Sequence, residues 1–160
     1  MASERARELA DAVEAVNLEL IQLVRGSSDE QWLRTANDEG DSRAVGVIAH
    51  HVGHGHLNTA EWMDTALSGH EVTITLDEID VENAEHAASY HDVAREETIR
   101  LLTENGDQLR DKIAALTDEE LAKTAFHRGA GREMSVAALA QLGHRHVTGH
   151  LATIRDALDL

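Results

Sequence analysis

AQLGHRHVTGHLATI, residues 140–154, places three histidines within seven positions of an otherwise apolar helical pattern. A second stretch, VIAHHVGHGHLNTAEWM at residues 47–63, is also rich in histidine. The chain has 11 histidines in 160 residues, and seven of them lie in these two stretches. Two helices that carry imidazoles beside apolar side chains predict that both helices face a common interior.

The helix that contains residues 140–154 turns two of its histidines toward its apolar face. An α-helix advances about 100° per residue, so His146 and His150 fall within this face and His144 falls near its boundary. His146 and His150 are four residues apart, so one side chain lies above the other. This spacing lets two imidazoles reach one metal ion. The apolar face itself comprises Val136, Leu139, Gly143, Val147, Ile154 and Leu158.

The helix that contains residues 47–63 offers a third imidazole. Val45, Ile48, Val52, Thr59 and Met63 define its apolar face. His51 lies at one edge of this face and His56 near the other, whereas His50 and His54 lie on the far side and are expected to be solvated. His56 replaces His51 as the inward histidine if the helix is rotated differently.

A shared metal ion is the simplest explanation of several inward histidines. One histidine on an apolar face is usually a core residue that is hydrogen-bonded to backbone or water. Three buried imidazoles without partners would cost about 1–3 kcal/mol each, and one divalent metal ion satisfies all three. We therefore predict that His51, His146 and His150 bind a metal ion. His91 is either a further ligand or a core histidine. The remaining histidines are expected at the surface or in loops: His70, His86 and His127.

Composition narrows the classes of partner and compartment. The net charge is −16 and the pI is about 4.9, so nucleic acid and anionic membranes are predicted to be repelled. The chain has no cysteine, so a metal site must use histidine and carboxylate. The N-terminal MASERARELADAVEAV has charges where a signal peptide needs an apolar run, which predicts a cytoplasmic protein. The longest stretch without Asp, Glu, Lys or Arg, residues 44–60, is too short to span a bilayer.

The pattern of apolar residues predicts an all-α four-helix bundle that forms one domain over residues 1–160. The absence of proline suits long helices. Ser28 with Gln31 and Thr117 with Glu120 have capping-box spacing, which predicts a short helical turn at each place. TANDEGDSR and HRGAGRE are expected to be loops, and residues 68–80 a partly extended connection, because Val72, Ile74 and Leu76 alternate. SDEQWLRTA resembles TDEELAKTA, and VGHGHL resembles LGHRHV, so the chain contains a weak internal repeat. The predicted helices cover residues 3–25, 43–66, 81–116, with a kink at Asn105-Gly106, and 134–158.

These histidine stretches resemble those of the DinB-like superfamily of four-helix-bundle metalloproteins. RAVGVIAHHV is similar to the stretch before the family's first ligand, which assigns His51, and HVTGHLATI is similar to the stretch with two ligands four apart, which assigns His146 and His150. The chain departs from the family in two places. Ser42-Arg43 stands where a tryptophan is common, and Leu151-Ala152-Thr153 stands where Arg-Gly-Gln often follows the last ligand.

The resemblance implies an up-down-down-up bundle with a long connection between its second and third helices, a divalent metal at its core and often a homodimer. Some members are mycothiol- or bacillithiol-dependent transferases, or mycothiol-dependent maleylpyruvate isomerase N-terminal-like domains. The function that we expect is a metal-dependent enzyme that activates an exogenous low-molecular-weight thiol for transfer or isomerisation of a small molecule. Alternatives are a metal-assisted hydrolase and a non-catalytic or stress-associated binding module. Zinc and nickel both suit imidazole ligands.

Overall fold

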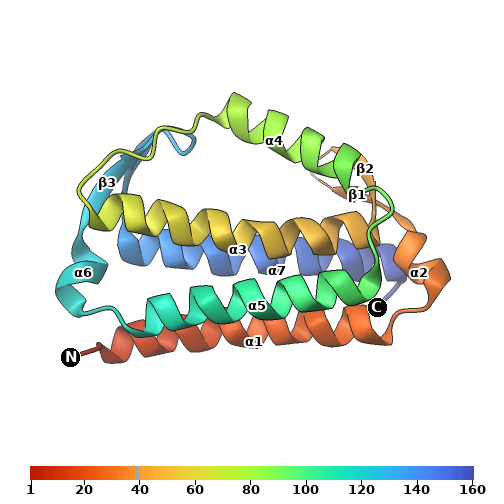
Figure 1. The fold of residues 1–160 in the computed structure, drawn as a ribbon, viewed down its shortest axis with the longest axis horizontal. Helices are drawn as coiled ribbons and strands as arrows, with labels where there is room; N and C mark the ends of the chain where they lie inside the picture. Colours follow the sequence, from red (N-terminus) through yellow and green to blue (C-terminus); the bar gives the residue numbers. More distant parts are fainter. Residues whose placement is uncertain (39) are drawn as a thin grey trace.

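A computed structural model describes residues 1–38 and 40–160 and shows a bundle of four long helices (Figure 1). α1 and α7 run in one direction along the bundle, and α3 and α5 run in the other, which confirms the predicted up-down-down-up order. None of these helices, nor any other described helix, has the length and apolar character to cross a membrane. The four helices are α1 (Glu4–Gly26), α3 (Val45–Leu67), α5 (Arg95–Ala114) and α7 (Val136–Leu158).

The bundle core consists of two apolar clusters separated by a polar layer. One cluster contains Met63 and Leu139, and the other contains Ile48 and Val147. Between them the Asn17 amide donates to the Leu102 carbonyl at 2.9 Å, and its Oδ1 lies 2.9 Å from Nε2 of His56. These bonds join α1, α3 and α5 at mid-height. Buried polar groups need such partners, so this layer favours one alignment of the three helices.

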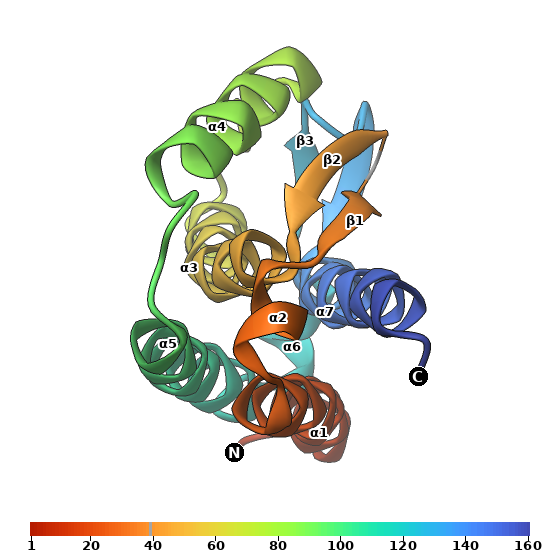
Figure 2. The same cartoon turned by 90° about the vertical axis from the view of Figure 1, so that its right-hand side faces the viewer.

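A third layer covers the outer side of α3 and α7 (Figure 2). It contains α4 (Leu76–Ser89), which carries no buried residue, and two antiparallel hairpins. α1 and α5 lie on the opposite side of α3 and α7 (Figure 2). The hairpins pair β1 (Thr35–Asp38) with β2 (Asp41–Ala44) and β3 (Thr124–His127) with β4 (Arg132–Ser135).

The predicted internal repeat appears as a repeated order of elements. A long helix, a short helix, a hairpin and a second long helix form α1–α2–β1–β2–α3 and again α5–α6–β3–β4–α7. The short helices, α2 (Asp29–Leu33) and α6 (Asp118–Ala122), begin at capping boxes, as predicted from the spacing of Ser28 with Gln31 and Thr117 with Glu120. Each half therefore delivers one histidine-bearing helix to the middle layer.

The structure corrects three predictions about secondary structure. The helix predicted over residues 81–116 is two helices, α4 and α5, because the chain crosses from the outer layer to the bundle at residues 90–94. α5 passes straight through Asn105-Gly106, where a Cβ would approach the Asn17 side chain. The two predicted loops are largely hairpins, with Glu39 outside the described residues. Val72 in the connection forms one parallel bridge to His127 of β3.

Candidate metal centre and its pocket

The structure brings His51 of α3 together with His146 and His150 of α7. Nε2 of His146 lies 3.0 Å from Nε2 of His51 and 3.1 Å from Nε2 of His150. One ring nitrogen from each residue lies within 4.8 Å of the corresponding nitrogens of the other two. The rings meet edge to face, at interplanar angles of 69° to 85°. The three nitrogens thus converge on one point, as the ligands of a metal ion must.

A glycine on α3 makes room for this convergence. A Cβ at Gly55 would lie 2.8 Å from Nδ1 of His146, closer than nonbonded atoms approach. Gly55 is one helical turn beyond His51, so it lies directly beside the position where the His146 ring crosses from α7. The absent side chain allows an imidazole of one helix to lie against the backbone of the other.

The environment keeps His51 unprotonated. Its side chain is 9% exposed, and burial lowers its pKa to about 2, with further lowering by His146, His150, His86 and Arg43. A neutral imidazole is the form that binds a metal ion, because only an unprotonated nitrogen has a lone pair to donate. The three imidazoles therefore fit a divalent cation by donor chemistry as well as by position, and borderline ions such as zinc and nickel suit such a set.

A cavity of about 330 Å³ opens beside the cluster. His51 and His146 lie in its wall, together with residues from α4, from β3 and from the turn that follows β3. A cavity of this volume accepts a small molecule. The other lining residues are a mixture of apolar, neutral polar and acidic residues: Gly55, Asn58, Thr59, Trp62, Leu76, Ile79, Asp80, Glu82, Asn83, His127, Gly129, Ala130 and Leu142.

His127, predicted at the surface or in a loop, is instead buried in the wall of this cavity. Its side chain is 2% exposed and packs edge to face against Trp62, with ring centroids 4.8 Å apart. The Ala130 backbone N–H donates to Nδ1 at 3.2 Å, which leaves the proton of the neutral ring on Nε2. No group among the described residues partners this buried Nε2. The structure therefore presents one unsatisfied donor beside the cavity, which no spacing in the sequence indicated.

The remaining single histidines lie away from the cluster. His56, the predicted alternative to His51, is buried but bonded to Asn17. His91, predicted as a ligand or a core residue, is exposed in the turn after α4, with Nδ1 2.9 Å from the Ala88 carbonyl. His144 is half-buried, as expected at the edge of the apolar face, and His70 is exposed as predicted.

A second cluster of three histidines contradicts the prediction that His50 and His54 are solvated and that His86 lies at the surface. His50 is 1% exposed, and His54 and His86 are half-buried. Burial, helped by the neighbouring His54, lowers the pKa of His50 to about 4; burial also lowers that of His54. Burial, with His50, His54 and Arg43, lowers the pKa of His86 to about 4. His50 and His54 have the same i, i+4 spacing as His146 and His150, so the signal was present in the sequence.

The fold and the sequence of this chain were compared with those of known proteins. YfiT from Bacillus subtilis, described as a probable metal-dependent hydrolase with an unusual four-helix bundle topology, superposes with a TM-score of 0.77 and 21% identity. The match covers 98% of this chain and 87% of YfiT, and at this identity it establishes the fold. No curated protein matches the sequence. The sequence model of the DinB superfamily matches residues 12–154, nearly the whole chain. The protein therefore belongs to the DinB superfamily.

Proposed function

We propose that this protein is a metal-dependent enzyme that holds one divalent cation with His51, His146 and His150 and acts on a small molecule in the adjoining cavity. The observation that carries the proposal is that two of the three converging imidazoles, His51 and His146, also line the cavity. A metal ion held there would be accessible to a substrate, whereas a purely structural site is closed by its ligands.

The chain's own residues supply binding and orientation. A divalent cation with three protein ligands and an open position acts as a Lewis acid that acidifies a bound water or thiol. Nε2–H of His127 supplies a buried donor for a polar atom of the substrate. Trp62, Ile79 and Leu142 supply apolar contact, and Asp80 and Glu82 give the same cavity a negative wall. This wall favours neutral or cationic substrates over anionic ones.

The nucleophile that we propose is an exogenous low-molecular-weight thiol such as mycothiol, which would attack an electrophilic substrate in a transfer or isomerisation reaction. The chain contains no cysteine, so such a thiol must come from a cofactor. Metal-assisted hydrolysis is the second candidate, and the description of YfiT as a probable metal-dependent hydrolase favours it. The metal that we propose is zinc or nickel. The homodimer implied by the family resemblance remains a prediction, which sedimentation analysis can check.

The test has two stages, beginning with metal. After removal of metal and reconstitution with zinc, elemental analysis should show that His150→Ala has lost one equivalent relative to the wild type. His144→Ala is the matched control, because His144 is half-buried on the same helix but outside the cluster. It should bind as much zinc as the wild type. Full zinc content in His150→Ala would refute the assignment of these ligands.

The second stage identifies the reaction. The reconstituted enzyme is assayed with a chromogenic aryl halide in the presence and absence of a low-molecular-weight thiol, and with a chromogenic ester without thiol. Thiol transfer predicts turnover that requires both zinc and thiol and disappears in His150→Ala. Zinc-dependent ester cleavage without thiol would instead establish the hydrolase, and the absence of zinc-dependent turnover in both assays would contradict a catalytic role.

A further inference from the structure

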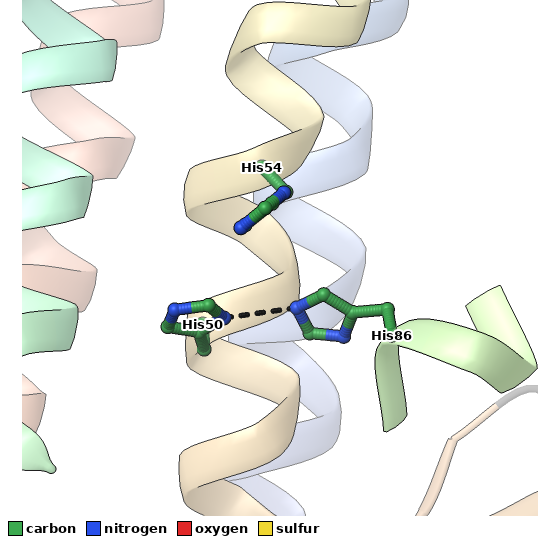
Figure 3. Close-up of side chains that lie close together, drawn as sticks. All are labelled: His50, His54 and His86. Atoms are coloured by element: carbon green, nitrogen blue, oxygen red, sulfur yellow. Dashed lines mark hydrogen bonds between the residues drawn. The ribbon is translucent and has the colours of Figure 1, made fainter. Parts of the chain in front are cut away.

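The outer side of α3 carries a second set of converging imidazoles, distinct from the first. His50 and His54 are one turn apart on α3, and His86 reaches toward them from α4 (Figure 3). Nδ1 of His50 lies 2.9 Å from Nε2 of His86. One ring nitrogen from each of the three residues lies within 4.8 Å of the others. This is the same spacing criterion that the first cluster meets.

An aromatic ring, that of Tyr90, covers one side of this cluster. The Tyr90 ring, which follows α4, lies 4.2 Å from the His50 ring, 4.8 Å from the His86 ring and 5.4 Å from the His54 ring, measured between centroids. His50 is almost fully buried, whereas His54 and His86 remain partly open to solvent. A cation therefore has a route to the cluster, and the ring of Tyr90 limits the water around it.

Nearby charges act on this cluster in opposite directions. The Glu97 carboxylate interacts favourably with a positive charge at His50, and the Arg43 guanidinium interacts unfavourably with one at His86. Arg43 forms an ion pair with Asp41 at 3.0 Å, which offsets part of its effect. The chain as a whole carries a net charge of −16, which attracts cations.

The cluster joins α3 to α4, a helix that is only loosely packed against the rest of the protein. α4 contains no buried residue, so apolar burial contributes little to its position. Yet Leu76, Ile79, Asp80, Glu82 and Asn83 of α4 form one wall of the cavity beside the first cluster. A ligand shared between α3 and α4 would therefore fix that wall.

We propose that His50, His54 and His86 form a second divalent-cation site that fastens α4 to α3 and so holds one wall of the cavity in place. Two imidazoles at i, i+4 on one helix and a third from a facing helix match the donor requirements of zinc and similar ions. The second site is a neighbour of the first, because the rings of His86 and His51 have centroids 5.5 Å apart. Consecutive residues serve different sites, since His50 and His51 point about 100° apart around α3.

Stoichiometry tests the site directly. The metal-free protein is equilibrated with zinc, and bound zinc is measured by elemental analysis after dialysis. The wild type should bind two equivalents, and His86→Ala and His54→Ala, which alter different helices, should each bind one. His150→Ala should also bind one, and the double variant His86→Ala/His150→Ala should bind none. His91→Ala is the control, because His91 is exposed just after α4 and lies outside both clusters; it should bind two.

The pattern of losses separates this site from the first. Suppose that the wild type binds one equivalent of zinc, which is lost in His150→Ala but kept in His86→Ala and His54→Ala. This result would overturn the second site and leave the first intact. One equivalent that disappears in His86→Ala but persists in His150→Ala would support it and remove the first. Two equivalents in both His86→Ala and His54→Ala would also overturn it.

Hydrogen exchange tests the fastening of α4. Zinc should slow exchange of the amides of residues 76–89 at least tenfold in the wild type, because opening of α4 would then require loss of a ligand. The same amides should not be slowed by zinc in His86→Ala, which still has the first site. Equal exchange with and without zinc in a wild type that binds two equivalents would show that the second site does not hold α4.

Discussion

Single positions decide whether the imidazoles of the first cluster can meet. His51, His146 and His150 come from two helices, and their nitrogens converge only because the ring of His146 lies against α3 at Gly55. Residues that lie behind metal ligands often change affinity by 10–100-fold when they are altered. Gly55 belongs to this group, although it contributes no ligand atom itself.

Replacement of Gly55 by alanine should weaken zinc binding at the first site by about tenfold or more. The new Cβ would lie 2.8 Å from Nδ1 of His146 and would force the ring away from its partners. The fold should persist, since alanine is favoured over glycine in a helix by about 1 kcal/mol. Isothermal titration with zinc measures the change. Gly149→Ala on α7 is the control, because its Cβ would meet no atom within 4 Å; equal affinities for the two variants would contradict the argument.

His56 should make stability depend on pH. Burial lowers its pKa from 6.5 to about 4 in the folded protein. As pH falls from 6.5 to 4, the unfolded chain gains a proton at this ring that the folded protein does not, so the free energy of unfolding should decrease by about 3 kcal/mol. Above pH 6.5 and below pH 4 this residue should add no further change. Urea unfolding of the metal-free protein at several pH values measures the effect.

His56→Gln removes this titration while its amide can still donate to Asn17. Between pH 4 and 6.5 the free energy of unfolding of the variant should fall less steeply with decreasing pH than that of the wild type. The two slopes should differ by the contribution of one proton at most, about 1.4 kcal/mol per pH unit. Other histidines with lowered pKa values, among them His50 and His86, keep part of the acid dependence in both proteins. Identical slopes in the two proteins would show that His56 titrates alike in the folded and unfolded states.

The helices are set by short local signals at their ends. Ser3, Ser28, Thr75, Thr117 and Ser135 each accept a hydrogen bond from the backbone at the start of a helix. Thr75 and Glu78 form a capping box of the same type as those predicted at Ser28 and Thr117. The sequence therefore contained a signal for the start of α4. The alternation of Val72, Ile74 and Leu76 favoured an extended connection at the same place, so the helix was not predicted there.

Loss of the cap of α7 should destabilise the protein measurably. Ser135 accepts from the Ala138 backbone N–H at 3.1 Å, and replacement of such a cap by alanine costs about 1 kcal/mol. Ser135→Ala should therefore lower the free energy of unfolding by about that amount in urea titrations. Ser89→Ala, at an exposed position near the end of α4, should change it by less than about 0.5 kcal/mol. Similar losses in the two variants would contradict a specific role for the cap.

In the whole molecule, the two histidine clusters lie beside the apolar clusters of the bundle. The two apolar clusters lie within the four-helix bundle, whereas both histidine clusters and the cavity involve the outer side of α3, where α4 and β3 cover it. The family resemblance implied a metal at the bundle core. The three imidazoles predicted to hold it meet between α3 and α7, beside a cavity that the third layer completes.

Metal should stabilise the entire fold by mass action, because the unfolded chain has no preformed site. Free zinc at a hundred times its dissociation constant should add about 2.7 kcal/mol per site, which corresponds to a rise in Tm of roughly 5–10 °C for a chain of this size. Differential scanning calorimetry with and without zinc measures the shift. An unchanged Tm at saturating zinc would contradict binding to the folded state.

The sequence by itself determined the local features: four long helices, the capped turns, the internal repeat and the pairing of His146 with His150 at i, i+4. These depend on periodicity and on contacts between residues a few positions apart. Only the tertiary structure decided that α4 and α5 lie in different layers. Both halves of the helix predicted over residues 81–116 have a helical pattern, and no local signal indicates where the chain passes from the outer layer to the bundle. It also decided that His50, His54, His86 and His127 are covered. A single-helix analysis treats the face away from the core as solvated, and here a third layer, formed by residues distant in the chain, buries it.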